Sequence, residues 1–229
     1  WQTFPDANSI DYIYFTHWHA DHIFGLPSLM TRWWEDNRKK ELTILGQIGT
    51  EEFVKNLLEE AYPGVFWDYE GNFSDRIGEP PSPGTLKKPH FKINFLNSDA
   101  SFDIADFKIT LAETNHSRKN LAIRLDTREN GKPKSFAFSG DGDFTEKSLK
   151  LFSGLDLLVH ETYLLDRKIL GHGSISNAIK NSESLDIKNL AIVHINRDVR
   201  RNQTKEISNL LKASRVNCFM PEPGDTFEI

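Results

Sequence analysis

The chain has 229 residues, of which 38% are hydrophobic and 27% charged, and its formal net charge is −5. These values are typical of a single globular domain and argue against a generally basic nucleic-acid surface. No apolar run reaches the roughly 20 residues of a membrane span, so no membrane partner is expected, and Cys218 as the only cysteine excludes an intrachain disulfide and suits a reducing cytoplasm.

The first predicted element runs directly into a metal-binding pattern. Ile10–Phe15 is rich in β-branched and aromatic residues, which predicts a buried strand. Three imidazoles and one carboxylate follow within six residues, as His17-Trp18-His19-Ala20-Asp21-His22. Neutral imidazole is the commonest protein ligand of transition metals, and carboxylate is a second suitable donor. The segment therefore predicts a metal site.

A second strand and a long helix come next. Thr43–Leu45 predicts the strand, and Thr50 is expected to cap a helix that ends at Tyr62. The side chains expected to face inward are Phe53, Leu57, Leu58 and Ala61. The proline-rich segment Gly64–Pro89 predicts an exposed excursion, with a lid as the alternative.

The remainder of the chain changes from consecutive strands to alternating strands and helices. The predicted strands are Lys92–Leu96, Phe107–Ala112, Leu121–Leu125, Ser135–Ser139, Leu155–Val159, Leu190–Val193 and Val216–Met220. The predicted helices run from Thr145 to Phe152, over Ile175–Ser182 and over Thr204–Ala213. Asn130-Gly131 predicts a hairpin turn. The pattern indicates an α/β fold in which helices cover sheets.

Several polar side chains stand where predicted strands end. His116 follows one strand, Asp141 follows another, and His160 and His194 come directly after two more. Strand ends of a layered α/β protein can converge on one face, so we expect these residues to contribute to a common site. His90 lacks this context and is expected at the surface.

The candidate ligands outnumber what one metal ion needs. They are His17, His19, His22, His116, His194, Asp21 and Asp141. Five imidazoles and two carboxylates exceed one tetrahedral zinc site and fit two divalent metals that share a bridging ligand. Zinc is favoured by the imidazole-rich set, with manganese and iron as alternatives. Because no serine or cysteine nucleophile motif is present, metal-bound hydroxide is the expected nucleophile.

These residues resemble the metallo-β-lactamase superfamily and, within it, the ribonuclease Z-like phosphodiesterase branch, from about Ile10 to the C-terminus. The segment from His17 to His22 resembles its His-x-His-x-Asp-His motif, and Asn115-His116-Ser117 and Ser139-Gly140-Asp141 resemble its later metal motifs. The resemblance implies one domain, residues 1–229, with a four-layer αββα sandwich, and it makes a homodimer an expectation. The resemblance implies several strands before the first motif, of which this sequence shows only Ile10–Phe15, so the others are expected to be missing.

The resemblance also implies a role for each ligand. The implied ligands are His17, His19 and His116 for the first metal, Asp21, His22 and His194 for the second, and Asp141 as the bridge. Asp21 is counted among the catalytic residues as well.

Two further motifs resemble those of ribonuclease Z. His160-Glu161-Thr162 resembles its His-Glu-Ala-Thr motif, with Thr162 in place of alanine, and Gly171-His172-Gly173-Ser174 resembles its Gly-His-Ser-Thr motif. The resemblance implies that His172 gives a proton to the leaving oxygen and that Glu161 orients it, which makes both catalytic candidates. Such a proton donor suits phosphodiester cleavage, because the reaction expels an alkoxide.

One departure from ribonuclease Z bears on the substrate. Short ribonuclease Z enzymes carry a long arm that grips tRNA between the third histidine and the bridging aspartate, whereas His116 and Asp141 are only 25 positions apart. The leading hypothesis is therefore hydrolysis of a small phosphodiester, such as a cyclic nucleotide or cyclic phosphate. The alternatives are tRNA 3′-end processing, acyl hydrolysis by a lactonase or thioesterase, and a non-catalytic metal-stabilised binding module.

Overall fold

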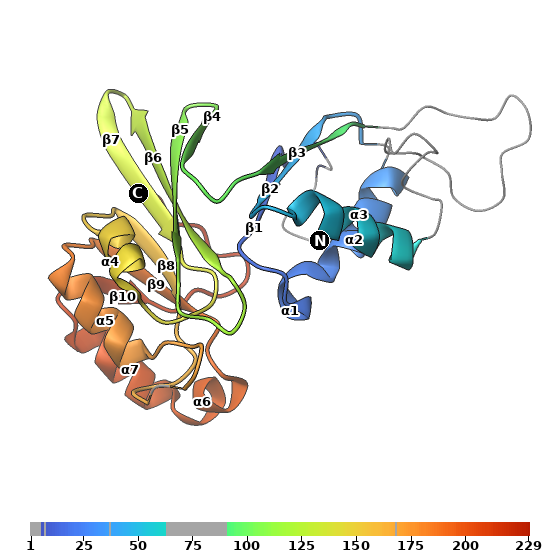
Figure 1. The fold of residues 1–229 in the computed structure, drawn as a ribbon. Coiled ribbons are helices and arrows are strands. Elements are labelled where there is room, and N and C mark those ends of the chain that lie inside the picture. The colour runs from blue at the N-terminus through green and yellow to red at the C-terminus, as the bar shows by residue number, and fades with distance from the viewer. Residues whose placement is uncertain (1–5, 7, 37, 63–90, 168) are drawn as a thin grey trace, which may run out of the picture. The chain divides into compact units, whose positions relative to one another are not determined.

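The computed structural model describes residue 6 and residues 8–36, 38–62, 91–167 and 169–229. The chain divides into two compact units, Trp1–Ser98 and Asp99–Ile229, here called unit 1 and unit 2 (Figure 1). The single domain expected over residues 1–229 stays a prediction. The excursion predicted for Gly64–Pro89 and the surface position predicted for His90 lie outside the described residues.

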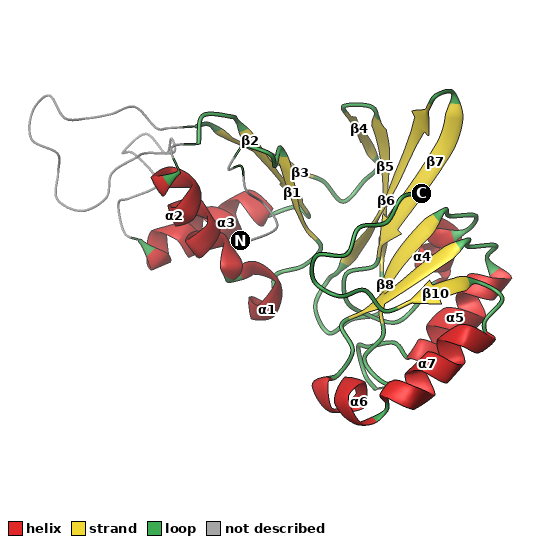
Figure 2. Cartoon of the chain, turned by 180° about the vertical axis from the view of Figure 1, so that it is seen from behind, coloured by secondary structure: helices red, strands yellow, loops and turns green. Residues whose placement is uncertain are grey.

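Unit 1 is a parallel sheet with helices packed on one face (Figure 2). Its strands, in spatial order, are β1 (Tyr12–Phe15), β2 (Leu42–Gly46) and β3 (Ile93–Asn97). Its helices are α1 (Ala20–Ile23), α2 (Gly25–Glu35) and α3 (Thr50–Ala61). Met30 and Trp33 of α2 and Leu58 of α3 pack with Ile44 of β2 in one buried cluster. This packing fixes the end of β1, from which the histidine-rich motif starts.

Helix α3 corrects two expectations from the sequence. Gly49, with φ of +96°, occupies the cap position, and Thr50 is the first helical residue rather than the cap. Because Thr50 lies inside the helix, its hydroxyl does not cap the helix end; it is buried and accepts a hydrogen bond from the Trp18 indole at 3.3 Å. Ala61 is exposed, and Val54, one turn before Leu58, is buried in its place.

Unit 2 contains a seven-stranded mixed sheet in the order β10-β9-β8-β7-β6-β5-β4. Its strands are β4 (Phe102–Ile104), β5 (Phe107–Glu113), β6 (Leu121–Glu129), β7 (Lys132–Phe138), β8 (Leu157–Glu161), β9 (Asn189–Val193) and β10 (Asn217–Phe219). Strands β4 to β7 pair antiparallel, and β7 to β10 pair parallel. The Asn130-Gly131 turn joins β6 and β7, with positive φ at both residues, as predicted.

Helices cover one face of this sheet (Figures 1 and 2). They are α4 (Glu146–Phe152), α5 (Ile175–Ser184), α6 (Arg197–Asn202) and α7 (Thr204–Ala213). Thr145 caps α4 through a capping box with Ser148, which confirms the predicted cap. No described helix is both long enough and apolar enough to cross a membrane.

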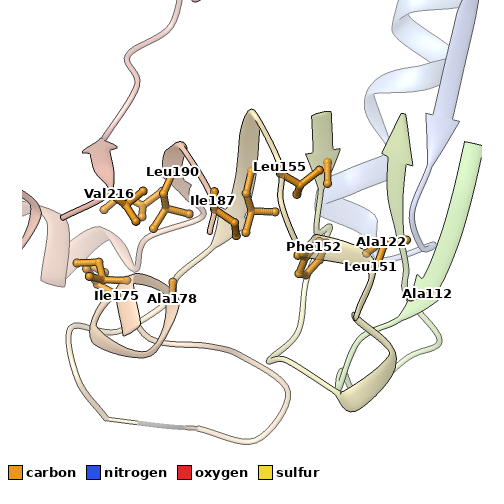
Figure 3. Packing of buried hydrophobic residues seen from close by; sticks show 14 of the residues in the cluster. Ala112, Ala122, Leu151, Phe152, Leu155, Ile175, Ala178, Ile187, Leu190 and Val216 are labelled. Carbon is orange, nitrogen blue, oxygen red and sulfur yellow. The ribbon is translucent and has the colours of Figure 1, made fainter. Parts of the chain in front are cut away.

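The core of unit 2 lies between α5 and the parallel strands. Figure 3 shows Ile175 and Ala178 of α5 close to Ile187, Leu190 and Val216. Each large side chain buried in this way stabilises the fold by about 1.5–3 kcal/mol. The core thus holds the ends of the parallel strands, where the candidate site residues lie.

Strand β8 lies two residues further along the chain than predicted. It pairs in parallel with β9, in the register His160 with Ile192 and Glu161 with Val193. His160 and Glu161 are therefore its last two residues and do not follow it. Leu155 is buried before the strand begins, which explains why an apolar run alone misplaced the boundary.

Candidate metal centre

The histidine-rich motif forms a compact cluster in unit 1. His17 lies just beyond β1 and is fully buried, His19 precedes α1, and Asp21 and His22 lie within α1. The His17 ring centroid is 4.8 Å from that of His19 and 4.2 Å from that of His22. The carboxylate of Asp21 also belongs to this cluster, because its Oδ2 lies 3.4 Å from Nε2 of His22. The cluster thus gathers three imidazoles and one carboxylate.

Two neighbours fix this segment. The Thr16 hydroxyl is 3.0 Å from Nδ1 of His17, so Nε2 is the ring nitrogen that could bind a metal. The Trp18 indole stacks on Phe53 of α3, with ring centroids 4.9 Å apart and planes at 12°. Trp18 therefore ties the motif to α3.

A second cluster forms in unit 2 at the ends of three strands. His116 lies beyond β5, Asp141 beyond β7 and His194 beyond β9, as the sequence predicts. Asp141 Oδ2 is 4.0 Å from His116 Nε2 and 3.5 Å from His194 Nε2. His172 joins this cluster, since its ligand atom lies within 4.8 Å of those of His116 and Asp141. One carboxylate thus lies between two imidazoles.

The backbone holds the imidazole of His116 and has an unusual conformation at His194. Nδ1 of His116 donates to the carbonyl of Gly171 at 2.7 Å, and a carbonyl can only accept, so Nε2 is the nitrogen that faces Asp141. His194 has φ of +54°, a left-handed conformation that is costly for a residue with a Cβ atom. Such strain is retained where the surrounding structure fixes a functional side chain.

A residue that sequence reasoning missed supports the Asp141 loop. Asn120 is fully buried, and its Nδ2 donates to Thr114 Oγ1 at 2.7 Å and to the Ser139 carbonyl at 2.8 Å. Its Oδ1 accepts from the Asp141 amide at 3.1 Å. Gly142 follows with φ of +108°, and a Cβ there would come within 2.5 Å of Thr114 Oγ1. The only sequence signal for this role is a polar residue directly before an apolar strand.

Glu161 connects the Asp141 loop to the loop that carries His172. Its Oε1 accepts from the backbone amides of Gly142 at 3.0 Å and Gly173 at 2.8 Å, and it lies 3.4 Å from His172 Nδ1. Burial raises the pKa of the Glu161 carboxyl to about 8, outweighing the two amides that lower it, and Asp141 raises it further. Glu161 and His172, which the sequence predicts to act together, thus lie 3.4 Å apart where hydrogen bonds to Glu161 join their two loops.

His160 belongs to the core rather than to the metal ligands. Its ring is fully buried and stacks on Phe144, with centroids 4.1 Å apart and planes at 14°, and Nδ1 donates to the carbonyl of Glu161 at 2.6 Å. Burial lowers the pKa of His160 to about 4, although the hydrogen bond to Glu161 and the charge of Asp143 raise it. At neutral pH this imidazole is uncharged.

The donor chemistry of both clusters fits divalent metal ions. Imidazole nitrogens and carboxylate oxygens are the donors of zinc, manganese and iron sites. In each cluster one imidazole is held through Nδ1, as metal-binding histidines commonly are. The structure therefore supports divalent metal binding by these residues.

Known proteins similar to this chain agree with these observations. The sequence model of the family described as "Anti-Pycsar protein Apyc1" matches residues 4–215. Ribonuclease Z of Staphylococcus epidermidis (strain RP62A) is 26% identical over 255 residues, which cover 96% of this chain and 82% of that protein.

Solved structures agree on the fold. The metallo-β-lactamase fold protein YhfI from Bacillus subtilis has a TM-score of 0.69 and 19% identity, and the match covers 98% of this chain and 80% of that one. A diphosphatase from the PhnP family has a TM-score of 0.64 and 17% identity, with coverage of 96% and 72%. The predicted α/β metallo-β-lactamase fold is thereby confirmed.

Proposed function

Because the chain belongs to the Anti-Pycsar protein Apyc1 family and is a ribonuclease Z-like hydrolase of the metallo-β-lactamase superfamily, we propose that it hydrolyses a small phosphodiester, such as a cyclic nucleotide or a cyclic phosphate. The observation that carries this proposal is the imidazole of His172. It lies among the candidate ligands His116 and Asp141 and is backed by the buried Glu161. A proton donor beside metal ligands suits a reaction that expels an oxygen leaving group.

We assign the metal ligands as the sequence implies. They are His17, His19 and His116 for one ion, Asp21, His22 and His194 for the other, and Asp141 as a shared ligand. When bound, two divalent ions, with zinc favoured, would polarise phosphoryl oxygens and make water more acidic. The hydrogen bonds at Nδ1 of His17 and His116 support this assignment, because they direct Nε2 to the metal.

Each proton of the proposed reaction has a donor or an acceptor in this chain. Hydrolysis forms one bond between water oxygen and phosphorus and breaks the bond from phosphorus to the leaving oxygen. His172 gives a proton to the leaving oxygen, and Glu161, which faces Nδ1, orients the imidazole so that Nε2 is the donor. Asp21, whose side chain is 68% exposed, takes the proton that water loses. A cyclic diester gives one product that carries a phosphomonoester and a hydroxyl group, and an acyclic diester gives a phosphomonoester and a separate alcohol.

The segment between His116 and Asp141 supports a small substrate. This segment forms a hairpin of strands β6 and β7 that closes in the two-residue Asn130-Gly131 turn. It therefore carries no long arm of the kind with which short ribonuclease Z enzymes grip tRNA. The net charge of −5 also disfavours a long polyanion. Processing of the tRNA 3′ end is the second candidate, because curated relatives of this chain are named ribonuclease Z. We expect a cytoplasmic protein that forms a homodimer.

Turnover measurements test the proposed function. Zinc- or manganese-loaded protein should hydrolyse bis-p-nitrophenyl phosphate or a 3′,5′-cyclic nucleotide, and Asp141→Ala should lower kcat/KM at least about 100-fold, because it removes the shared ligand. His172→Ala should lower kcat by about 100-fold or more on substrates with poor leaving groups. A precursor tRNA and a lactone, assayed in parallel, identify the alternatives. Wild-type turnover by Asp141→Ala would contradict the mechanism.

A further inference from the structure

The imidazole of His172 lies against the ring of Tyr163, a residue that has no role in the reaction proposed above. Tyr163 follows β8 by two residues, and its ring stacks on His172 with centroids 4.7 Å apart and planes at 27°. The His194 ring lies nearly parallel to that of His172, at 5.7 Å and 11°, and 6.0 Å from that of Tyr163. The three rings thus form a small cluster around the proposed proton donor.

We propose that Tyr163 is a positioning residue that holds the imidazole of His172 in the plane from which it protonates the leaving oxygen. The inference rests on the proposed function, since it gives Tyr163 a part in the same step. Offset stacking of two rings contributes about 0.5–1.5 kcal/mol and prefers near-parallel planes. Rotation of the His172 ring out of its plane would lose this contact.

The loop around His172 needs such a restraint. Gly171, with φ of +81°, and Gly173 flank the histidine, and Leu170 just before them is 92% exposed. Glycine adds backbone freedom, so the backbone alone fixes the side chain weakly. Around the ring, Glu161 faces Nδ1 at 3.4 Å, the His116 ring lies edge-on with centroids 5.2 Å apart, and the His194 ring lies nearly parallel at 5.7 Å. The Tyr163 ring, at 4.7 Å, is the nearest of these three rings and stacks on the imidazole.

The backbone of Tyr163 is placed independently of its ring. Its amide donates to the Gly173 carbonyl at 3.1 Å, and its carbonyl accepts from the Asn196 amide at 2.9 Å. The Gly173 amide in turn donates to Glu161. These bonds survive any side-chain substitution, so truncation of the ring tests the stacking contact itself.

The test compares Tyr163→Leu, Tyr163→Met and Tyr163→Phe with the wild-type protein on two diesters. Bis-p-nitrophenyl phosphate expels a stable phenolate and needs little protonation, whereas diphenyl phosphate expels a more basic one and needs more. The leucine and methionine variants should lower kcat about tenfold more on diphenyl phosphate than on the nitrophenyl ester, with KM unchanged. Tyr163→Phe should restore both rates, because it keeps the ring.

A readout without turnover accompanies the rates. In metal-free protein, the ring-current shift of the His172 Cε1–H resonance should be present in wild type and Tyr163→Phe and lost in Tyr163→Leu. An equal loss of kcat on both esters would indicate a merely structural role and overturn the inference, as would an unmoved resonance in Tyr163→Leu.

The failures of the two proposals are distinguishable. Wild-type behaviour of Tyr163→Leu beside an inactive His172→Ala overturns the inference and keeps the proposed function. Absence of any phosphodiester turnover by the wild type, or full activity of His172→Ala, overturns the proposed function, and the inference, which rests on it, falls with it.

Discussion

Asn120 shows how one buried amide can define the loop of a candidate metal ligand. Its carboxamide makes three hydrogen bonds, to Thr114, Ser139 and Asp141, which lie 6, 19 and 21 positions away in the sequence. Buried polar groups that lose a partner cost more than the bond itself was worth, because they remain out of contact with water. The position of Asp141 therefore depends on a residue that binds no metal.

Asn120→Ala should lower both stability and metal affinity. It leaves the Ser139 carbonyl and the Asp141 amide without this partner, which should cost about 2–6 kcal/mol of unfolding free energy at about 1–3 kcal/mol for each buried group. Loss of an outer support of a ligand typically costs about 10–100-fold in metal affinity. Urea unfolding and competition with a zinc chelator measure the two effects. The control Asn209→Ala removes an exposed amide from α7 and should change neither. Unchanged affinity in Asn120→Ala would contradict the role given to it.

The sequence does not reveal which charged side chains are buried. The run Arg38-Lys39-Lys40 is typical of a solvated segment, yet Arg38 is fully buried. Its guanidinium donates to the carbonyls of Ile10, Lys40 and Glu41 and lies 4.6 Å from the Trp33 ring centroid. Although Lys40 and Glu41 are near in sequence, the Ile10 carbonyl is 28 positions away, so no local pattern identifies this burial. The histidine-rich motif was identifiable because its ligands are adjacent in sequence.

Elements with their own local signals were predicted closely. Helix α7 has the predicted bounds, Thr204–Ala213, and the capping box of Thr145 and the Asn130-Gly131 turn lie where predicted. Elements without such signals were missed. Helix α6 buries none of its residues and so has no apolar periodicity, and β4 is only three residues long. The bounds of β8 were wrong because its register is set by pairing with β9.

A single carboxylate joins three neighbouring strands of unit 2. Asp156, just before β8, accepts from the Ser135 amide of β7 at 2.8 Å and from Lys188, just before β9, at 2.6 Å. Its own carbonyl accepts from the Asn189 side chain at 2.7 Å. Burial alone would raise the pKa of Asp156, but the bonds from Lys188 and Ser135 outweigh it and lower the pKa below the ordinary value of 3.8. The folded protein therefore favours the ionised form.

This pKa shift predicts a pH-dependent contribution to stability. Because the folded pKa of Asp156 is depressed, its contribution is fully present above about 3.8 and is lost as pH falls through the lower folded value. Asp156→Asn should destabilise the protein by about 1 kcal/mol at pH 7, and this difference should shrink below pH 4. Urea unfolding at pH 7, 5 and 3 measures it. Asp106→Asn, an exposed carboxylate in the β4–β5 turn, is the control. A difference that stays constant with pH would contradict this assignment.

For the whole molecule, the proposed ligand sets draw on both units. Unit 1 carries His17, His19 and His22, and unit 2 carries His116 and His194. In each unit the strand ends that hold these residues are fixed by a hydrophobic core of that unit. The sequence predicts this ligand set from motif spacing, whereas the supports of the ligands, such as Thr16 and Asn120, come from the tertiary structure.

The proposed sharing of ligands predicts that metal binding depends on residues of both units. The wild-type protein should bind two divalent ions, and a chelator should lower its Tm, since a ligand at 100 times its Kd stabilises the folded state by about 2.7 kcal/mol. His19→Ala in unit 1 and His116→Ala in unit 2 should each weaken the first metal, and the double variant should lose little more than either single one, because both remove ligands of the same ion. Metal analysis and thermal unfolding, with and without added zinc, measure this. Additive losses in the double variant would show that the two histidines bind different ions and would overturn the ligand assignment.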